Sequence, residues 1–598
     1  MYAAFDFPRH PLSREDGERL HGAFLQPPAR WLRAFAPGEV AAVLDQAWRA
    51  SLNGAWVLGG VRYEAAAAFD AALAIHGPSD GPLAEFAVFD AAPVDWPADT
   101  APPQALNSDW LDTQAEVAEL HQIERIREWI RSGDCYQVNL TTRLKSRLAE
   151  GATAWQLFRA LHAAQPGGFS LFLQDGDHAV ASVSPELFFD WRPSSAQGES
   201  AGSQDWQLAA QPMKGTAPRG RDVVEDEARQ QYLRTSVKER AENLMIVDLL
   251  RNDMGRLARL GSVRVPRLFE LHALSTVWQM TSTVTAHTPA SATLSQVFAA
   301  LFPCGSVTGA PKVRAMQIIA ELEPGPRGFY CGALGLLQPG GAATFNVPIR
   351  TVELAAGHLQ CGIGSAITLD SDPAAEVAEW RAKSRFLLRA QAPIAALETL
   401  RLQDGQFPRL AGHLQRLQRT ARHFGLALDL AEVRAALQRL AQEKAEGSWR
   451  TRLTVAANGA ITLQAMPLAD TPAVVSLALA SAPIDSRGSA AEFLQHKTTR
   501  RELYDALLAH KPPEAFDLIL WNTDGELTEC AIGNLALQRA GQWLTPRAEA
   551  GLLPGVYREQ LLAEGRIVEA RLMIGDLAQA EGVAFFNSLR GWCPAQLL

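Results

Sequence analysis

The strand pattern of this chain starts afresh near residues 392–396, and this restart constrains the fold more than any other feature. Residues 328–369 alternate in apolar side chains between glycine turns, which predicts antiparallel strands. Residues 397–405 then predict a new hairpin. A chain of 598 residues also exceeds what one hydrophobic core supports. We therefore expect a first domain in two parts, residues 1–110 and 111–391, and a separate domain over residues 392–598.

Composition places the chain among ordinary globular proteins. Hydrophobic residues make up 47% of it and charged residues 20%, which argues against a disordered chain. The net charge of −9 argues against a nucleic-acid partner. No apolar run approaches a membrane span and no signal segment opens the chain, so we expect a cytoplasmic protein with no membrane partner. Neither a disulfide framework nor a zinc site is expected, because no C-x-x-C pair occurs among the cysteines at 135, 304, 331, 361, 530 and 593.

Lys214 lies where a strand-like segment meets a glycine turn, in Gln211-Pro212-Met213-Lys214-Gly215-Thr216. A lysine acts as a nucleophile only after its amine has lost a proton. Because the pKa of a free lysine is about 10.4, this requires burial or a cationic neighbour. A Lys-Gly pair is more often a solvated turn, so the segment alone leaves both interpretations open.

Three further segments accompany this lysine in a fixed order. Ser184-Pro185-Glu186-Leu187 ends a hairpin-like stretch, and residues 238–253 predict a helix by their apolar period and lack of breakers. Residues 302–312 form a glycine-punctuated loop whose Pro311 can open a helix, and the N–H groups at such a helix start suit a carboxylate or phosphate. Together the four segments resemble the chorismate-utilising enzymes, the family of anthranilate, isochorismate and aminodeoxychorismate synthases, over residues 111–388.

This resemblance implies an α/β (α+β) fold of antiparallel sheets flanked by helices, with chorismate as the substrate. Glu239 and Glu242 lie three apart on one predicted helix, and Glu376 and Glu379 on another, so each pair shares a helix face. Carboxylates from two helices suit Mg²⁺, although solvated helix faces are the simpler interpretation of the pattern itself. The resemblance assigns the Mg²⁺ ligands to Glu242 and Glu379, with Glu239 and Glu376 acting beside them or through water.

The resemblance also implies which groups would bind chorismate. Tyr330 and Arg350 recur at the family's spacing, and the planar fork of an arginine binds a carboxylate bidentately. Gln279 stands where the family often has a histidine, and it can hydrogen-bond a hydroxyl but cannot carry a proton. The expected substrate-binding residues are Tyr330, Arg350, Gly362, Gly364, Ser365, Thr308 and Gln279.

Lys214 distinguishes the branches of that family. Anthranilate synthases carry alanine there, whereas aminodeoxychorismate synthases carry the lysine of Pro-Ile-Lys-Gly-Thr, which Pro212-Met213-Lys214-Gly215-Thr216 resembles. The resemblance implies that Lys214 attacks ring carbon C2 while Glu186 protonates the departing C4 hydroxyl, after which ammonia adds at C4 to give 4-amino-4-deoxychorismate. No cysteine nucleophile elbow is found in the sequence, so the ammonia is expected from a separate glutamine amidotransferase subunit or from solution.

A second series of segments follows residue 396. It comprises His413-Leu414-Gln415-Arg416-Leu417, residues 495–501, Leu527-Thr528-Glu529-Cys530 and residues 544–556. These segments resemble the fold-type IV pyridoxal-phosphate enzymes, which include class IV aminotransferases and aminodeoxychorismate lyase. The resemblance implies that Lys497 binds pyridoxal 5'-phosphate covalently, that Glu529 faces its pyridine nitrogen, and that its phosphate is held by Arg416, Gly555 and Val556. Such a lyase would convert 4-amino-4-deoxychorismate to 4-aminobenzoate and pyruvate, in folate biosynthesis.

Several alternatives stay open. The first strand of the pyridoxal-phosphate family is missing before Leu397, and Tyr557 stands where aminotransferases have threonine. The first domain could make anthranilate or salicylate instead. The second could be an aminotransferase, or a degenerate domain that only stabilises the first domain or docks its glutaminase.

Overall fold

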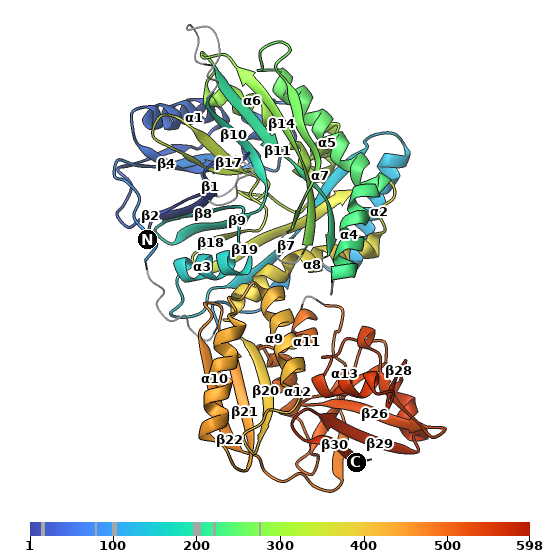
Figure 1. Ribbon diagram of the computed structural model, residues 1–598. Helices are drawn as coiled ribbons and strands as arrows, with labels where there is room; N and C mark the ends of the chain where they lie inside the picture. The colour runs from blue at the N-terminus through green and yellow to red at the C-terminus, as the bar shows by residue number, and fades with distance from the viewer. Residues whose placement is uncertain are drawn as a thin grey trace. The chain divides into compact units, whose positions relative to one another are not determined.

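The computed structural model describes residues 1–12, 18–77, 81–97, 105–194, 205–218, 223–273, 277–488 and 490–598 (Figure 1). They form two compact units, Met1–Gln391 and Ala392–Leu598. In the described part of the chain, no helix is long and apolar enough to cross a membrane. All six cysteines are buried and free.

The first unit contains two large sheets whose strand pairs are antiparallel. The described strands of the first sheet are, in spatial order, β15 (Gly309–Ala310), β7 (Gln137–Arg147), β19 (His358–Ile367), β18 (Thr351–Ala355), β9 (His178–Ser184), β8 (Phe169–Asp175), β1 (Ala3–Pro8) and β2 (Arg19–Phe24), with β6 (Leu111–Asp112) on β7. Those of the second are β12 (Met213–Pro218), β14 (Val277–Thr288), β11 (Trp206–Gln211), β10 (Leu187–Pro193), β17 (Ala343–Asn346), β16 (Ala333–Leu337), β4 (Trp56–Val61), β5 (Ala84–Phe89) and β3 (Arg30–Ala34), with β13 (Arg264–Ala273) on β14.

The two sheets bury a common core, and helices cover their other faces (Figure 1). Side chains such as Phe5, Leu171 and Leu334, which alternate along their strands, form this core and are fully buried. The first sheet packs against α2 (Glu116–Arg131), α3 (Ala154–Ala164), α7 (Lys312–Leu322) and α8 (Pro373–Gln391). The second packs against α1 (Pro37–Leu52), α4 (Val223–Thr235), α5 (Val237–Gly255) and α6 (Leu294–Leu301). The expected antiparallel sheets flanked by helices are confirmed.

The local predictions that place the functional residues are also confirmed. The helix predicted over residues 238–253 is α5, which begins where the Ser236 side chain accepts a hydrogen bond from the Glu239 backbone N–H. Pro311 directly precedes α7 and lies at its N-cap. The loop before it contains a short 3₁₀ turn, η2 (Gly305–Val307). A second such turn, η1 (Tyr63–Ala68), follows β4.

The second unit combines a small sheet and a larger one. The small sheet is β20 (Ala396–Gln403), β21 (Ser448–Val455) and β22 (Ile461–Pro467), covered on one face by α9 (Leu410–Phe424) and α10 (Leu430–Glu443). The larger sheet is, in spatial order, β25 (Leu527–Cys530), β24 (Asp517–Trp521), β23 (Val475–Leu479), β30 (Gly591–Leu597), β29 (Gly582–Asn587), β26 (Asn534–Arg539), β27 (Gln542–Pro546) and β28 (Val568–Ala570). Its helices are α11 (Glu492–Gln495), α12 (Glu502–Leu508) and α13 (Val556–Ala563), with short 3₁₀ turns η3 (Ala548–Ala550) and η4 (Ile574–Gln579).

The hairpin predicted over residues 397–405 is reduced to one antiparallel bridge across the turn, between Gln403 and Gln406. Gly405, with φ of +73°, does turn the chain, but the turn leads to α9 rather than to a second strand. The partner of β20 is β21, which is distant in the sequence. Leu400 of β20 packs with Leu414 and Leu417 of α9, so burial of this apolar face decides the connection.

Candidate active sites

Lys214 lies in β12 of the first unit, beside α5 and β14. The next residue, Gly215, adopts a φ of +95°, a conformation that glycine tolerates best. Burial lowers the pKa of the Lys214 ammonium, and the nearby Lys383 ammonium lowers it further. Three carboxylates act in the opposite direction without cancelling the shift. The structure thus provides the environment that a nucleophilic lysine requires.

Three side chains hold the backbone around Lys214. Asn243 of α5 donates from Nδ2 to the carbonyl oxygen of Lys214 over 3.2 Å. Gln279 of β14 donates to the carbonyl of Gly215 over 3.0 Å and accepts from the Thr216 hydroxyl over 3.0 Å. The carboxylate of Glu239 accepts the Thr216 backbone N–H. Gln279, which we expected to bind substrate, therefore has both ends of its amide on the lysine strand.

Glu186 lies just before β10 and is 4% exposed. Its Oε1 accepts a hydrogen bond of 2.8 Å from the hydroxyl of Ser306, in the loop before α7. Burial raises the pKa of its carboxyl above the ordinary value, although Ser306 and the Lys214 ammonium act in the opposite direction. A raised pKa is the direction that suits a general acid.

The four predicted metal-binding carboxylates come together from α5 and α8. Burial raises the pKa of Glu242 and of Glu239, and neighbouring carboxylates raise both further. Burial also acts to raise the pKa of Glu379, but the Lys383 ammonium, 2.8 Å away, lowers it overall. Glu376 accepts hydrogen bonds from Ser365 over 2.5 Å and Ser371 over 2.7 Å.

These carboxylates suit a divalent cation in charge but are not arranged as a closed site. Across the described ranges of the chain, no three His, Cys, Asp or Glu side chains are placed to hold a metal ion. Mutual repulsion nevertheless contributes to the raised pKa of Glu239 and of Glu242, and a cation between the two helices would relieve it. Glu239, Glu376 and Glu379 each have a partner within the protein, and a cation bound by Glu379 would compete with Lys383 for its carboxylate.

Tyr330 lies in the turn before β16, with its ring against Gly362 of β19, and Arg350 directly precedes β18. A Cβ atom at Gly362 would lie 2.2 Å from the Tyr330 ring, so the ring requires glycine there. Arg350, with φ of +52°, donates to the side-chain oxygen of Gln165. Burial, and then the like charge of Arg389, lower the pKa of Arg350 to about 10. None of the described carboxylates lies within 4 Å of its guanidinium, which leaves it able to bind an anionic substrate.

The remaining predicted substrate residues are hydrogen-bonded to other parts of the first unit. The Ser365 hydroxyl accepts from Trp380 over 2.7 Å while donating to Glu376. The carbonyl oxygen of Gly364 accepts from Lys383 over 2.9 Å. The Thr308 hydroxyl donates to Cys304 over 3.1 Å and is fully buried. The side chains of Ser365 and Thr308 therefore support the site.

Arg327 was not identified from the sequence, although it anchors the loop that carries Ser306 and Thr308. It is 1% exposed, and its guanidinium donates to Val307 over 2.8 Å and to Glu323 over 2.9 and 2.6 Å. An isolated arginine between loop residues carries no local pattern that distinguishes it from a surface side chain.

In the second unit, Lys497 follows α11, and its backbone is hydrogen-bonded to the start of β20. Its carbonyl oxygen accepts the Leu397 backbone N–H over 2.9 Å. Burial, and then the like charge of Arg416, lower the pKa of the Lys497 ammonium to about 7. About half of the amine is therefore neutral at physiological pH, as a lysine that reacts with an aldehyde requires.

Glu529 of β25 is 4% exposed and accepts hydrogen bonds from the Tyr504 hydroxyl over 2.8 Å and the Leu553 backbone N–H over 3.2 Å. Burial raises its pKa to about 8. No described cation lies within 4 Å of it, and the more distant charges of Lys497 and Arg501 lower its pKa without cancelling the effect of burial. Tyr504 was not identified from the sequence. The one feature that could have drawn attention to it is its place seven residues after Lys497.

Arg416 and the start of α13 form the third part of this site. Glu398 binds Arg416 over 2.8 and 2.6 Å, and the ion pair lowers the pKa of Glu398 to about 2 despite its burial. Arg416 Nη1 lies 3.5 Å from the carbonyl of Pro554, directly before Gly555. Gly555 is the N-cap of α13, and a Cβ there would lie 2.1 Å from Asn534 Oδ1. Val556 begins the helix, whose first N–H groups suit a phosphate.

The donor set of the second unit fits pyridoxal 5'-phosphate. A buried amine with a pKa of about 7 suits the aldehyde, and a buried carboxyl group that a nearby cation would ionise suits the pyridinium nitrogen. The start of α13 with Arg416 beside it suits the phosphate.

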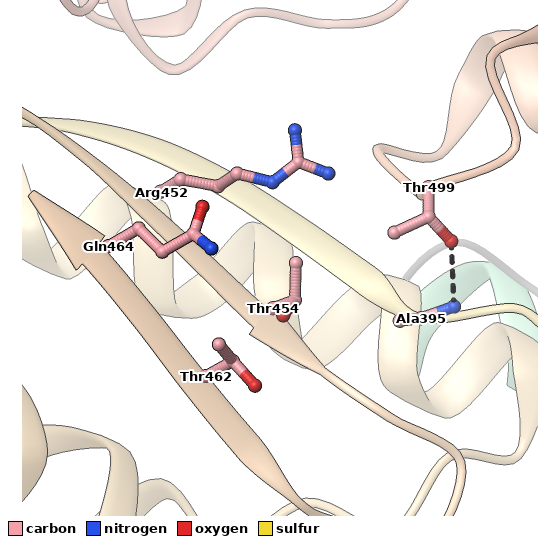
Figure 2. Close-up of a pocket in the computed structure, with 6 residues that line it drawn as sticks. All are labelled: Ala395, Arg452, Thr454, Thr462, Gln464 and Thr499. Atoms are coloured by element: carbon pink, nitrogen blue, oxygen red, sulfur yellow. Dashed lines mark hydrogen bonds between the residues drawn. The ribbon is translucent and has the colours of Figure 1, made fainter. Parts of the chain in front are cut away.

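A cavity of about 260 Å³ lies on the open face of the small sheet (Figure 2). Arg452 and Thr454 of β21 line it, together with Thr499, which follows Lys497 by two residues in the sequence. The Thr499 hydroxyl accepts the Ala395 backbone N–H over 3.1 Å, which ties this segment to the edge of the sheet. No described carboxylate forms an ion pair with Arg452, so the cavity suits a small anion. Its full lining is Ala395, Arg452, Thr454, Thr462, Gln464 and Thr499.

Comparison with known proteins identifies both parts of the chain. The family of chorismate binding enzymes matches residues 34–389, and amino-transferase class IV matches residues 395–598. The aminodeoxychorismate synthase component 1 of Klebsiella aerogenes is 44% identical over 285 residues, which cover 47% of this chain and 60% of that protein. The corresponding protein of Escherichia coli K12 is 40% identical over 284 residues, 48% of this chain and 60% of that protein.

The chain thus spans less than two thirds of the length of these relatives. Among solved structures, the anthranilate synthase component I of Streptococcus pneumoniae TIGR4 shares the fold of the first unit, with a TM-score of 0.51 and 22% identity over 62% of this chain and 94% of that one. Because the chorismate family matches more than half of the chain, the protein belongs to the chorismate binding enzymes and carries an amino-transferase class IV domain after them.

Proposed function

We propose that the first unit is an aminodeoxychorismate synthase and that the second converts its product to 4-aminobenzoate and pyruvate. One observation carries the first assignment. Burial lowers the pKa of Lys214 and raises the pKa of Glu186, and the two groups sense each other's charge. These shifts favour a neutral amine facing a protonated carboxyl, which are the states that covalent catalysis with acid assistance needs.

The reaction follows from that pair. The Lys214 amine forms a bond to C2 of chorismate, the ring double bond shifts, and the C4–O bond breaks as Glu186 gives its proton to the departing hydroxyl. Ammonia then bonds to C4, the bond between Lys214 and C2 breaks, and Glu186 recovers a proton. Atoms balance as chorismate plus ammonia giving 4-amino-4-deoxychorismate plus water.

The other residues of the first unit would hold the substrate in place. Arg350 lacks an ion-pair partner among the described residues and would bind a carboxylate, with the Tyr330 ring and hydroxyl beside it. Glu242 and Glu379 would hold Mg²⁺, which supplies positive charge for a second carboxylate. The ammonia would come from a separate glutamine amidotransferase, the partner implied by the likeness to component 1 proteins.

In the second unit, Lys497, Glu529, Arg416 and the start of α13 would hold pyridoxal 5'-phosphate. The cofactor supplies an electron sink for the carbon that bears the amine. Lys497 then moves the proton from that carbon, for which a pKa of about 7 is well matched. The cavity at Arg452 would receive the carboxylates of an acidic substrate (Figure 2).

The function is tested with chorismate, ammonium and Mg²⁺, with products followed by mass. We expect 4-amino-4-deoxychorismate, and 4-aminobenzoate when pyridoxal 5'-phosphate is also present. Lys214→Ala should reduce turnover by at least 1,000-fold, the order expected when a covalent nucleophile is lost, while the protein stays folded. Anthranilate or salicylate as the product, or near-normal turnover in this variant, would refute the proposed chemistry. Exchange between an amino acid and a keto acid would make the second unit an aminotransferase.

A further inference from the structure

Asn243 is the last side chain in a chain of hydrogen bonds that runs from the Phe269 backbone N–H through Ser282 to the carbonyl of Lys214. Asn243 directly follows Glu242 in the sequence and is 1% exposed. Asn243 Oδ1 accepts from the hydroxyl of Ser282 over 2.5 Å, and that hydroxyl oxygen accepts the Phe269 backbone N–H over 3.1 Å. Asn243 Nδ2 then donates to the carbonyl of Lys214 over 3.2 Å. Four elements, β13, β14, α5 and β12, are linked by this chain.

The chain fixes which way the Asn243 amide points. The Lys214 carbonyl can only accept a hydrogen bond, so it needs the NH₂ group of Asn243, and the Ser282 hydroxyl donates its proton to the amide oxygen that remains. The amide oxygen of Asn243 must therefore face Ser282, and its NH₂ group must face Lys214. Ser282 is fully buried, so water does not offer an alternative partner.

Holding this carbonyl matters because a lysine amine is carried on a long flexible side chain. The backbone of the lysine strand is irregular here: its register on β14 shifts between Met213 and Thr216, and Gly215 has a φ of +95°. Without a fixed backbone, the amine would sample positions away from Glu186 and the carboxylates of α5. A displacement of about 1 Å at a reacting group can cost on the order of 100-fold in rate.

We propose that Asn243 is a positioning residue for Lys214: its amide, oriented by Ser282, fixes the nucleophile relative to the acid and the metal-binding carboxylates. The proposal rests on the proposed function of Lys214. Asn243 does not touch the reacting atoms, because its contact is with the carbonyl of Lys214 and not with the amine. Its loss should therefore lower kcat rather than chorismate affinity.

The test compares Asn243→Ala, Ser282→Ala and Asn107→Ala in the full chain. Asn107 is a matched control, because it is 3% exposed and its amide donates to Ser108 and Ser146 away from the lysine. We expect Asn243→Ala to lower kcat for 4-amino-4-deoxychorismate formation by 10- to 100-fold with KM for chorismate within about threefold. Ser282→Ala should give a smaller loss of the same kind, and Asn107→Ala should leave kcat within twofold.

A second readout does not depend on turnover. The rate at which Lys214 is modified by an amine reagent, followed by peptide mass against pH, reports its pKa and access. In Asn243→Ala that profile should move to higher pH, toward an ordinary lysine. Combining Asn243→Ala with Ser282→Ala should add little to the effect of Asn243→Ala alone, because both break one chain.

The outcomes separate this inference from the function on which it rests. If Lys214→Ala is inactive but Asn243→Ala keeps kcat within twofold, the positioning role is refuted and the lysine chemistry stands. If Lys214→Ala is active, the lysine chemistry fails and the role of Asn243 fails with it. If Asn243→Ala does not fold, Ser282→Ala decides, and an unchanged kcat and modification profile in that variant overturn the proposal.

Discussion

The lowered pKa of Lys497 predicts how fast the second unit captures its cofactor at each pH. Only the neutral amine attacks the aldehyde of pyridoxal 5'-phosphate, and the pKa of Lys497 is about 7. The sign follows directly: because the pKa is lowered, the neutral form dominates above pH 7 and the protonated form below it. The capture rate should therefore rise with pH up to about 8 and then level off.

The magnitude can be worked from the same pKa. At pH 6 about 9% of Lys497 is neutral and at pH 8 about 91%, so capture should accelerate about tenfold over that range. A lysine with the ordinary pKa of about 10.4 is neutral in only about one molecule in 2,500 at pH 7. Lys497 should therefore react roughly 1,000-fold faster at pH 7 than an ordinary surface lysine of similar nucleophilicity.

The assay mixes cofactor-free protein with pyridoxal 5'-phosphate from pH 5.5 to 9.5 and follows the absorbance of the lysine-bound cofactor. Reduction followed by peptide mass then shows which lysine carries it. Lys497→Ala should lose the fast phase, and Lys444→Ala, a lysine of the same unit that stacks on Trp449, should keep it. A rate that keeps rising tenfold per pH unit through pH 9 would refute the reasoning, because Lys497 would then have an ordinary pKa.

Three further expectations follow from the two sites. Glu242→Gln and Glu379→Gln should each raise the Mg²⁺ concentration needed for half-maximal synthase activity by 10-fold or more; an unchanged metal titration would make them ordinary buried acids. Gly362→Ala should raise KM for chorismate at least tenfold, because the new Cβ would lie 2.2 Å from the Tyr330 ring and would push the ring aside. Normal kinetics would show that the ring has room to move. Lys497→Ala should accumulate 4-amino-4-deoxychorismate that an added lyase converts to 4-aminobenzoate, whereas undiminished 4-aminobenzoate would remove Lys497 from the reaction.

The sequence predicted those parts of the fold that have a local pattern. The apolar period of residues 238–253 and the proline before Lys312 specify α5 and the start of α7, and both elements are found. The strand partner of β20 had no such pattern. Residues 397–405 look like the first arm of a hairpin, yet their partner is β21, because the choice depends on packing against α9.

The candidate sites show the same division. Lys214, Glu186, Lys497 and Glu529 could be proposed because each stands in a distinctive segment. Asn243 and Arg327 could not, since their roles arise from contacts with residues far away in the sequence, the carbonyls of Lys214 and Val307. Gln279 shows the opposite case. It was predicted to bind substrate, but its amide is hydrogen-bonded to the neighbouring strand β12.

The six buried cysteine thiols can be used to measure how often the structure around each of them opens. Cys135, Cys304, Cys331 and Cys361 lie in the first unit, and Cys530 and Cys593 in the second. Burial raises the pKa of each thiol, so a thiol reagent at neutral pH modifies them only when the surrounding structure opens. Labelling rates, read cysteine by cysteine, would give the free energy of opening for each unit separately. A variant with low activity because its unit is destabilised can then be distinguished from one whose fold is intact and which has lost only a catalytic group.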